Sequence, residues 1–327
     1  MKSMTCKNIY KTLLRCAIFA TMINTANIAA AQADFELSQR WFNESLYNPA
    51  SAGNSFTTSF FLHARLQWVG MKGAPSTQAA SFDTYAEPIN SGFGINFMND
   101  KLGFTNTMNA RLMYAYYLPL GSNSAVSLGL SAGILSKNRN ITGAVVDNET
   151  DPEFAYGNYT YISPDFDFGF EYRGPFKFGA AIRHIGTLSK SEIPKQTVNI
   201  WSYFSARFNI AEQAAIEPLA SVQKAKTLWG EAGLLFYFMK TTSRDKYNDK
   251  FWVGGTYHTN NSLTLLAGVN VTPKFRFGYS FGHGLGNISH LSKWGTHEIF
   301  LAYQFNRIFY KDELCPAYRN AGVGRRR

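Results

Sequence analysis

The sequence predicts an all-β protein, a transmembrane antiparallel β-barrel of the outer-membrane type with about 14 strands. Three observations support this fold class. Apolar residues recur at every second position along most of the chain. Aromatic residues make up 16% of the sequence and charged residues only 17%, below the roughly 25% charge of an average soluble domain. No stretch reaches the roughly 18 consecutive apolar residues of a membrane helix.

The clearest alternation lies in residues 274–305. Aromatic residues occupy every second position of 275–281, and Arg276, Gly278 and Ser280 lie between them. Residues 299–305 repeat the pattern after a loop of Gly, Asn, Ser and His. One face of each strand is therefore apolar and the other small or polar. This dyad is typical of a membrane strand that faces lipid on one side and a wet lumen on the other.

The same dyad predicts the remaining strands, and the even total is the one that single-chain bacterial barrels require. These strands are residues 60–68, 78–85, 93–97, 110–118, 126–134, 166–172, 176–182, 198–208, 216–222, 228–238, 251–257 and 263–271. With both ends in the periplasm, odd-numbered turns face outside and should be long, as 137–163, 187–197 and 282–296 are. Two turns break the rule: 240–249 is long on the periplasmic side, and Asn260-Asn261 is short on the outer side.

Four segments follow from this reading. The pattern of residues 1–33 predicts a secretory signal: it has a basic start, then an apolar run, and a cleavage site at Ala31-Gln32-Ala33. Residues 34–54 lack alternation and form either an N-terminal periplasmic or plug segment or a frayed leader. Residues 55–306 form the barrel, and residues 307–327 a periplasmic tail. The sequence thus predicts a Sec-exported protein of a Gram-negative outer membrane, with outer-membrane lipid around it.

The mature chain would keep only Cys315 and have no internal disulfide. Removing four basic residues with the signal lowers the net charge from +10 to +6, of which Arg325–Arg327 supply three charges at the tail. No basic helix or aromatic-stacking module accompanies this balance, so we expect no nucleic-acid partner.

No motif predicts catalysis, a metal site or a cofactor. The spacing of His283, His290 and His297 matches no metal-ligand pattern and brings no cysteine. Nothing selects a nucleophile, base and orienting acid within mutual reach. The glycines of 282–286 precede no helix, so they form no phosphate-binding loop. We therefore expect a protein that is not an enzyme.

Charged residues in the lumen phase are the candidate functional residues. They can form a ladder of interior ion pairs that braces the barrel, or a polar passage or docking site. Five further aromatic residues are predicted to form the interfacial girdles: Trp68, Tyr85, Tyr114, Tyr116 and Trp294. The lumen-phase charges are Arg65, Arg111, Asp165, Asp167, Glu171, Arg183, Arg207, Glu231, Arg276 and Glu298.

Several motifs give the chain a family resemblance. They are FNESLYNPASAGN at 42–54, RLQWVGMKGAPSTQ at 65–78, RLMYAYYLPL with SLGLSAGIL at 111–135, SPDFDFGFEY at 163–172, and FGYSFGHGLGNISHLSKWGTHEIFLAYQF at 277–305. With these motifs the chain resembles the PorP/SprF family of type IX secretion system outer-membrane proteins of Bacteroidetes. The similarity runs in order over nearly the whole mature chain, although the tail after Arg319 matches no family pattern.

The resemblance implies a non-enzymatic part of a secretion and gliding-motility machine. Its expected partners are a secreted adhesin or other cargo protein and periplasmic type IX secretion components. The outside loops 137–163 and 282–296, or the periplasmic face, are expected to hold such a partner. The candidate partner loop contains His283, Asn287, His290 and Trp294.

A passive channel for small solutes is the alternative function. A barrel of about 14 strands is wide enough for a lumen unless the N-terminal segment plugs it. Glycines and serines on 126–134 indicate space inside, whereas Tyr117, Trp201, Tyr203 and Trp229 indicate a filled interior. The sequence leaves both functions open.

Overall fold

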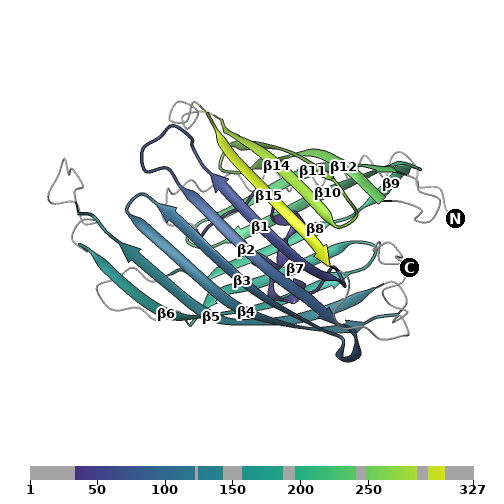
Figure 1. Cartoon of the computed structure of the whole chain (residues 1–327), viewed down its shortest axis with the longest axis horizontal. Coiled ribbons are helices and arrows are strands. Elements are labelled where there is room, and N and C mark those ends of the chain that lie inside the picture. The colour runs from purple at the N-terminus through teal and green to yellow at the C-terminus, as the bar shows by residue number, and fades with distance from the viewer. Residues whose placement is uncertain are drawn as a thin grey trace.

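The structure, a computed structural model, describes residues 34–121, 124–142, 157–186, 196–240, 248–285 and 294–305. One antiparallel sheet closes on itself, because β1 pairs with β15 and β10 with β11 (Figure 1). Strands β8 and β9 both pair with β10 and share one position in the wall, which gives a closed 14-strand barrel. The predicted fold class is confirmed. The predicted signal and C-terminal tail lie outside the described residues.

Each predicted strand corresponds to an observed one. The strands are β1 (Thr58–Leu66), β2 (Ser76–Ala86), β3 (Ser91–Leu102), β4 (Thr105–Pro119), β5 (Ala125–Arg139), β6 (Tyr159–Arg173), β7 (Lys177–Ile185), β8 (Asn199–Ser205), β9 (Phe208–Ala211), β10 (Ala214–Lys224), β11 (Leu228–Lys240), β12 (Asn248–His258), β13 (Ser262–Asn270), β14 (Phe275–Gly284) and β15 (Thr296–Phe305). Four short 3-10 helices accompany them: η1 (Arg40–Phe42), η2 (Glu44–Leu46), η3 (Pro49–Ser51) and η4 (Glu87–Ile89).

Burial along the strands follows the predicted dyad. On β5, the side chain of Leu130 is 58% exposed and that of Ser131 only 6%. The apolar positions face outward, where they would contact lipid, and the small or polar positions face the interior. Among the described residues, none of the helices has the length and apolar character needed to span a membrane.

The wall is taller on one side. Strands β4, β5 and β6 have 15 residues each, whereas β7 and β13 have 9. At a rise of about 3.4 Å per residue, the taller strands are longer by about 20 Å. They extend toward the odd-numbered turns (Figure 1). Part of the predicted loop 137–163 is therefore strand, since β5 ends at Arg139 and β6 begins at Tyr159.

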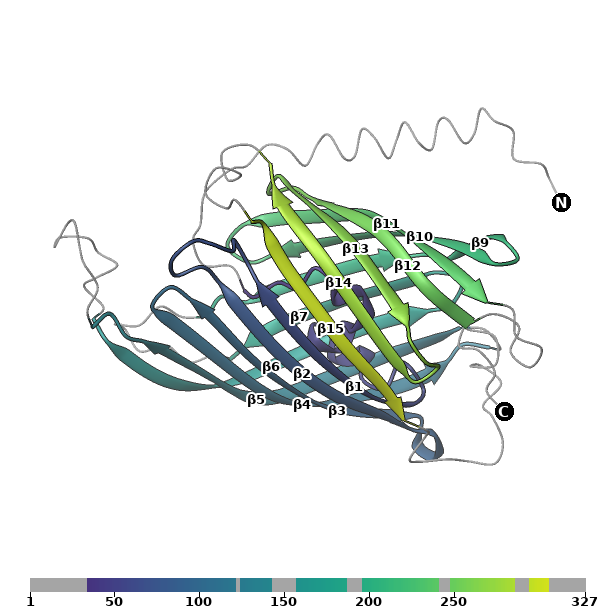
Figure 2. The same ribbon diagram turned by 45° about the horizontal axis from the view of Figure 1, so that its top comes forward.

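The segment before β1 lies inside the barrel, where Figure 2 shows it within the ring of strands. We call residues 34–57 the plug. It contains η1, η2 and η3, and nearly all of its side chains are buried. Phe35, Trp41 and Tyr47 of the plug belong to one apolar cluster with Trp201 and Phe300 of the wall. The hydrophobic core of this barrel is thus built between wall and plug.

Candidate functional site

The interface between the plug and the lumen wall gathers most of the buried charge of the described residues. The first plug residue, Asp34, is held by three wall side chains. Its Oδ2 accepts hydrogen bonds from Arg183 Nη1 at 2.6 Å and Asn199 Nδ2 at 3.0 Å, and lies 3.2 Å from His184 Nε2. Burial alone would raise the pKa of Asp34, but Arg183 and His184 outweigh it and hold that pKa well below its usual range.

A β-bulge places two consecutive side chains in this site. Phe166 pairs with Ile185 and Phe168 with Ile182, so β7 carries one more residue than β6 at this point. The extra residue is His184, which adopts a left-handed backbone with φ of 61°. Arg183 and His184 are consequently both buried, although strict alternation would place them on opposite faces.

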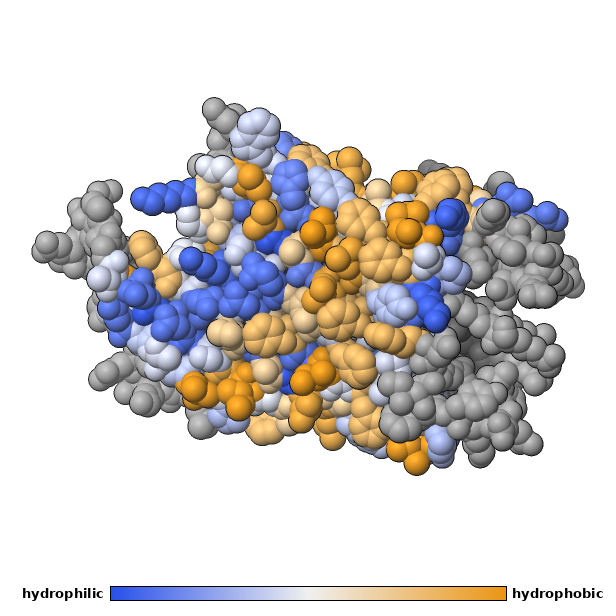
Figure 3. Space-filling view, viewed as in Figure 1, coloured by the Kyte–Doolittle hydropathy of each residue, from blue (hydrophilic) through white to orange (hydrophobic). Residues whose placement is uncertain are grey.

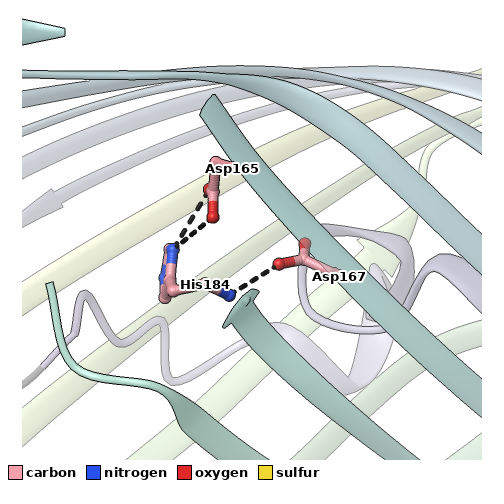
Figure 4. A group of neighbouring side chains, drawn as sticks. All are labelled: Asp165, Asp167 and His184. Atoms are coloured by element: carbon pink, nitrogen blue, oxygen red, sulfur yellow. Dashed lines mark hydrogen bonds and ion pairs between the residues drawn. The ribbon is translucent and has the colours of Figure 1, made fainter. Parts of the chain in front are cut away.

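His184 bridges plug and wall. Its Nδ1 lies 3.0 Å from Asp165 Oδ1, and its backbone N–H donates to Asp167 Oδ1 at 3.0 Å (Figure 4). Its other ring nitrogen faces Asp34. An imidazolium donates from both nitrogens, so the protonated ring fits a position between two carboxylates.

The same three residues, Asp165, Asp167 and His184, lie close enough to hold a metal ion. Their oxygens already accept hydrogen bonds, however. Asp167 Oδ2 accepts from Arg111 and Ser131, and Asp165 Oδ2 accepts from Asn109. An imidazolium at His184, with Arg111 and Arg183, would set three cations against the three carboxylates Asp34, Asp165 and Asp167. We interpret this cluster as an ion-pair network rather than a metal centre.

A second histidine, His258 of β12, has a similar pair of carboxylate neighbours. His258 Nδ1 lies 3.1 Å from Glu36 of the plug, and its Nε2 lies 3.2 Å from Glu231 of β11. Arg40 of the plug pairs with both carboxylates and lies over the Trp229 ring at 5.4 Å. Both histidines therefore sit between one carboxylate of the plug and one of the wall.

Glu298 of β15 binds the plug backbone. Its two carboxylate oxygens accept hydrogen bonds from the N–H groups of Ser38 at 2.7 Å and Gln39 at 2.9 Å. Arg65 of β1 lies opposite Glu298 in the strand register and pairs with it at 3.4 Å. Arg65 also donates to the Ser38 hydroxyl at 2.9 Å. The charges of the closing strands thus fix the plug as well as each other.

Another charged cluster, around Glu44 of the plug, lies near the even-numbered turns. Glu44 pairs with Lys177 and with Arg173, the latter at 3.3 Å. Glu171 pairs with Arg173 at 2.9 Å and accepts a hydrogen bond from Ser51 at 2.6 Å. The plug is therefore anchored by charge toward both ends of the lumen.

Between these clusters, glycines let the plug backbone approach the wall. A Cβ on Gly129 would lie 2.1 Å from Ala50 N, one on Gly169 would lie 2.0 Å from Asn48 Oδ1, and one on Gly92 would lie 1.8 Å from Ala52 O. None of these spacings tolerates a side chain. Of the small residues of 126–134, which indicated an open interior, Gly129 makes room for η3 and Ser127 donates a hydrogen bond to the Ala50 carbonyl of η3.

Most predicted lumen charges lie in these clusters. Two differ. Arg207 is exposed at the rim, where it pairs with Asp249 and lies 4.2 Å from the Tyr237 ring centroid, because the wall strand is interrupted between β8 and β9. Arg276 is half-buried over the Phe61 ring at 5.5 Å. The paired set is half-buried Arg65 together with the buried residues Arg111, Asp165, Asp167, Glu171, Arg183, Glu231 and Glu298.

One girdle prediction was wrong. Tyr85 is 2% exposed and packs inside the barrel against Phe56 and Tyr117, because its position on β2 belongs to the inward phase. Of the predicted partner loop, His283 and Trp294 are exposed, whereas Asn287 and His290 lie outside the described residues. Docking at this loop stays a prediction.

Sequence reasoning missed the plug side of every anchor, namely Asp34, Glu36, Arg40 and Glu44, together with His184 and His258. Residues 34–54 have no periodicity that could assign a phase to their charges. The bulge at His184 shifts the phase locally. The only available signal was that the chain has unpaired lumen charges and a charged, aperiodic segment before the first strand.

A closed barrel with an apolar outer face and a lumen filled by its own N-terminal segment defines a plugged outer-membrane barrel protein. The model of the type IX secretion system membrane protein PorP/SprF family matches residues 29–303. The chain therefore belongs to the PorP/SprF family.

Other comparisons add little. No curated protein matches the chain. Among solved structures, the TodX deltaS2S3 mutant monoaromatic hydrocarbon channel aligns at 12% identity and a TM-score of 0.49, covering 81% of this chain and 94% of its own. The CymD monoaromatic hydrocarbon channel aligns at 12% identity and a TM-score of 0.46, with 86% of this chain and 96% of that channel covered. Omp33 of Acinetobacter baumannii aligns at 11% identity and a TM-score of 0.41, with 77% of this chain and 99% of Omp33 covered. These likenesses carry no functional argument.

Proposed function

We propose that the protein is a non-enzymatic outer-membrane component of the type IX secretion machinery, reached by Sec export. In this role it binds a secreted adhesin or other cargo for export or surface attachment, and also contacts periplasmic components of the gliding and secretion machine. Family membership supports the general role. The lumen filled by the plug is the observation that favours a partner-binding role over a passive channel.

The plug leaves little room for a passive channel. Trp201 and Tyr203, both fully buried, extend from the wall to the plug, where Tyr47 lies 5.3 Å from Trp201 and Trp41 lies 6.4 Å from Tyr203 between ring centroids. A protein whose interior is filled and braced by ion pairs works through its rims. Exposed Trp294 at an odd-numbered turn and Lys274 at an even-numbered turn mark the two rims.

Site-specific photo-crosslinking in native outer membranes tests this function. A photo-reactive residue replaces Trp294 in one variant and Lys274 in another, and a third variant carries it at lipid-facing Leu265 as the control. Capture of a large secreted protein or a periplasmic machine component from either rim, but not from Leu265, supports the proposal. Absence of protein adducts at both rims would contradict it.

A further inference from the structure

The outer surface of the tall wall carries an apolar groove of about 520 Å³. It crosses β4, β5 and β6, and its volume is in the range of small-molecule sites, about 300–1,000 Å³. Ala132 lies between the larger side chains of Leu112 and Phe166, which are its register partners on β4 and β6. The groove therefore forms where Ala132, a small residue, interrupts a row of larger apolar side chains. The larger outward side chains around it are Phe93, Leu112, Tyr114, Leu130, Phe166, Phe168 and Ile185.

A polar row lies above the groove on the same strands. Asn106, Asn138 and Thr160 are paired in register across β4, β5 and β6, and Lys101 of β3 continues the row. Asn138 donates to Thr160 at 2.5 Å. These residues point outward, and Lys101, Asn138 and Thr160 are exposed. The row therefore offers amides, a hydroxyl and one cation on the outer face of the wall.

The groove and the polar row belong to one continuous surface. Asn138 lies six positions beyond Ala132 on β5, a span of about 20 Å. The outward side chains between them include Met108, Ile134 and Ile162, all exposed and apolar. Figure 3 shows hydrophilic side chains gathered toward the odd-numbered turns and hydrophobic ones beside them on this face. The transition from polar to apolar is where a membrane boundary would lie.

We infer that this surface is a binding site for one glycolipid of the outer leaflet, with an acyl chain in the groove and sugars on the polar row. Continuity with the lipid-facing wall selects a lipid as the occupant. Uncharged amides and a hydroxyl match saccharide hydroxyl groups, and the ammonium of Lys101 matches an acidic headgroup substituent. On the shorter strands β13 and β14, the last outward register pair of two side chains before the odd-numbered turn is Leu263 with His283. The described residues of these two strands therefore carry no matching outward row of amides and a hydroxyl.

Native mass spectrometry of the full mature protein, extracted from outer membranes in mild detergent, tests this inference. Three probes are added back in separate titrations: lipid A carrying core sugars, lipid A alone, and phosphatidylethanolamine. Ala132→Phe fills the groove on an exposed position, and the double change Asn138→Ala with Thr160→Val removes the sugar contacts. Ala267→Phe, at an exposed alanine on β13, and Asn260→Ala, at an exposed turn, are the matched controls. Heat-modified mobility on gels confirms that each variant is folded.

Wild type should retain one sugar-bearing glycolipid. Ala132→Phe should weaken its retention about tenfold, the effect of about two methylene groups leaving an apolar contact. The double variant should weaken the sugar-bearing probe alone, while both controls match wild type. Equal retention by wild type and Ala132→Phe would overturn the site. A double variant that loses phosphatidylethanolamine as strongly as the sugar-bearing probe would overturn the sugar assignment and indicate an ordinary annular lipid.

Discussion

Glu298 on the last strand binds the plug at Ser38, whose backbone N–H lies 2.7 Å from the carboxylate. The neighbouring N–H of Gln39 donates to the other oxygen. One carboxylate therefore satisfies two backbone donors that would otherwise be buried without partners. An arrangement of this kind depends on a charged acceptor with two oxygens.

Replacing Glu298 with Gln should loosen the plug. The amide offers one acceptor oxygen, so one of the two backbone N–H groups loses its partner, at a cost of about 1–3 kcal/mol. Hydrogen exchange of the Ser38 and Gln39 amides should accelerate, whereas the amides of β4 and β5 should stay protected. Glu212→Gln, at an exposed turn residue, is the matched control. Unchanged exchange at Ser38 would show that the carboxylate does not hold the plug.

Gly129→Val should displace η3. The new side chain would meet the backbone of Pro49 and Ala50 at distances no Cβ occupies, and overpacking of this kind costs about 1–3 kcal/mol. Limited proteolysis should cut the plug faster in this variant while the strands stay resistant. Gly230→Ala is the control, because its Cβ would make only ordinary contacts, the nearest at 3.5 Å. Equal proteolysis of both variants would argue against close packing of η3.

Replacing one member of the ion pair between Arg40 and Glu231 should lower the free energy of unfolding more than replacing both members. Arg40→Met leaves Glu231 buried beside His258 without its guanidinium, and removal of one member of a buried ion pair costs about 3–5 kcal/mol. The double variant Arg40→Met with Glu231→Leu should recover much of that loss. Chemical unfolding of the four combinations measures the coupling. Additive losses would show that the two residues do not act as a pair.

Plug anchoring should weaken in acid. The pKa of Asp34 is lowered in the folded protein because Arg183 and His184 outweigh the effect of burial. A group with a depressed folded pKa contributes stability that is fully present above its unfolded pKa, about 3.9, and is lost as pH falls toward the folded value. Proteolytic resistance of residues 34–40 should therefore decline below about pH 4.

Asp34→Asn separates this effect from general acid unfolding. The variant should show a weaker plug at neutral pH and a smaller further loss in acid, because the titrating carboxylate is gone. A decline in acid of equal size in wild type and Asp34→Asn would assign the effect to other carboxylates.

The wall was predictable from the sequence, because alternation reports directly which face of a strand meets lipid. The lumen charges Arg111, Asp167 and Glu231 were assigned to the correct face for the same reason. Their partners were not predictable. Asp34 and Arg40 lie in an aperiodic segment, and their contacts join residues more than a hundred positions apart, as from Arg40 to Glu231.

Local departures from alternation account for the remaining errors. The bulge at His184 turns a residue inward that alternation places outward. The interruption after Ser205 lets Arg207 reach the rim. The small side chains of Gly129 and Ser127 were interpreted as a sign of an open lumen, because a sequence pattern shows that side chains are small but not which other segment packs against them.

The claim that the plug closes the barrel is tested most directly by conductance in planar bilayers. Purified wild type and a variant lacking residues 34–54 are inserted under the same conditions. We predict that wild type stays closed and that the shortened variant, with its lumen charges exposed to water, opens steady ion-conducting channels. Steady conductance by wild type at the level of the shortened variant would contradict a closed lumen and favour the passive channel.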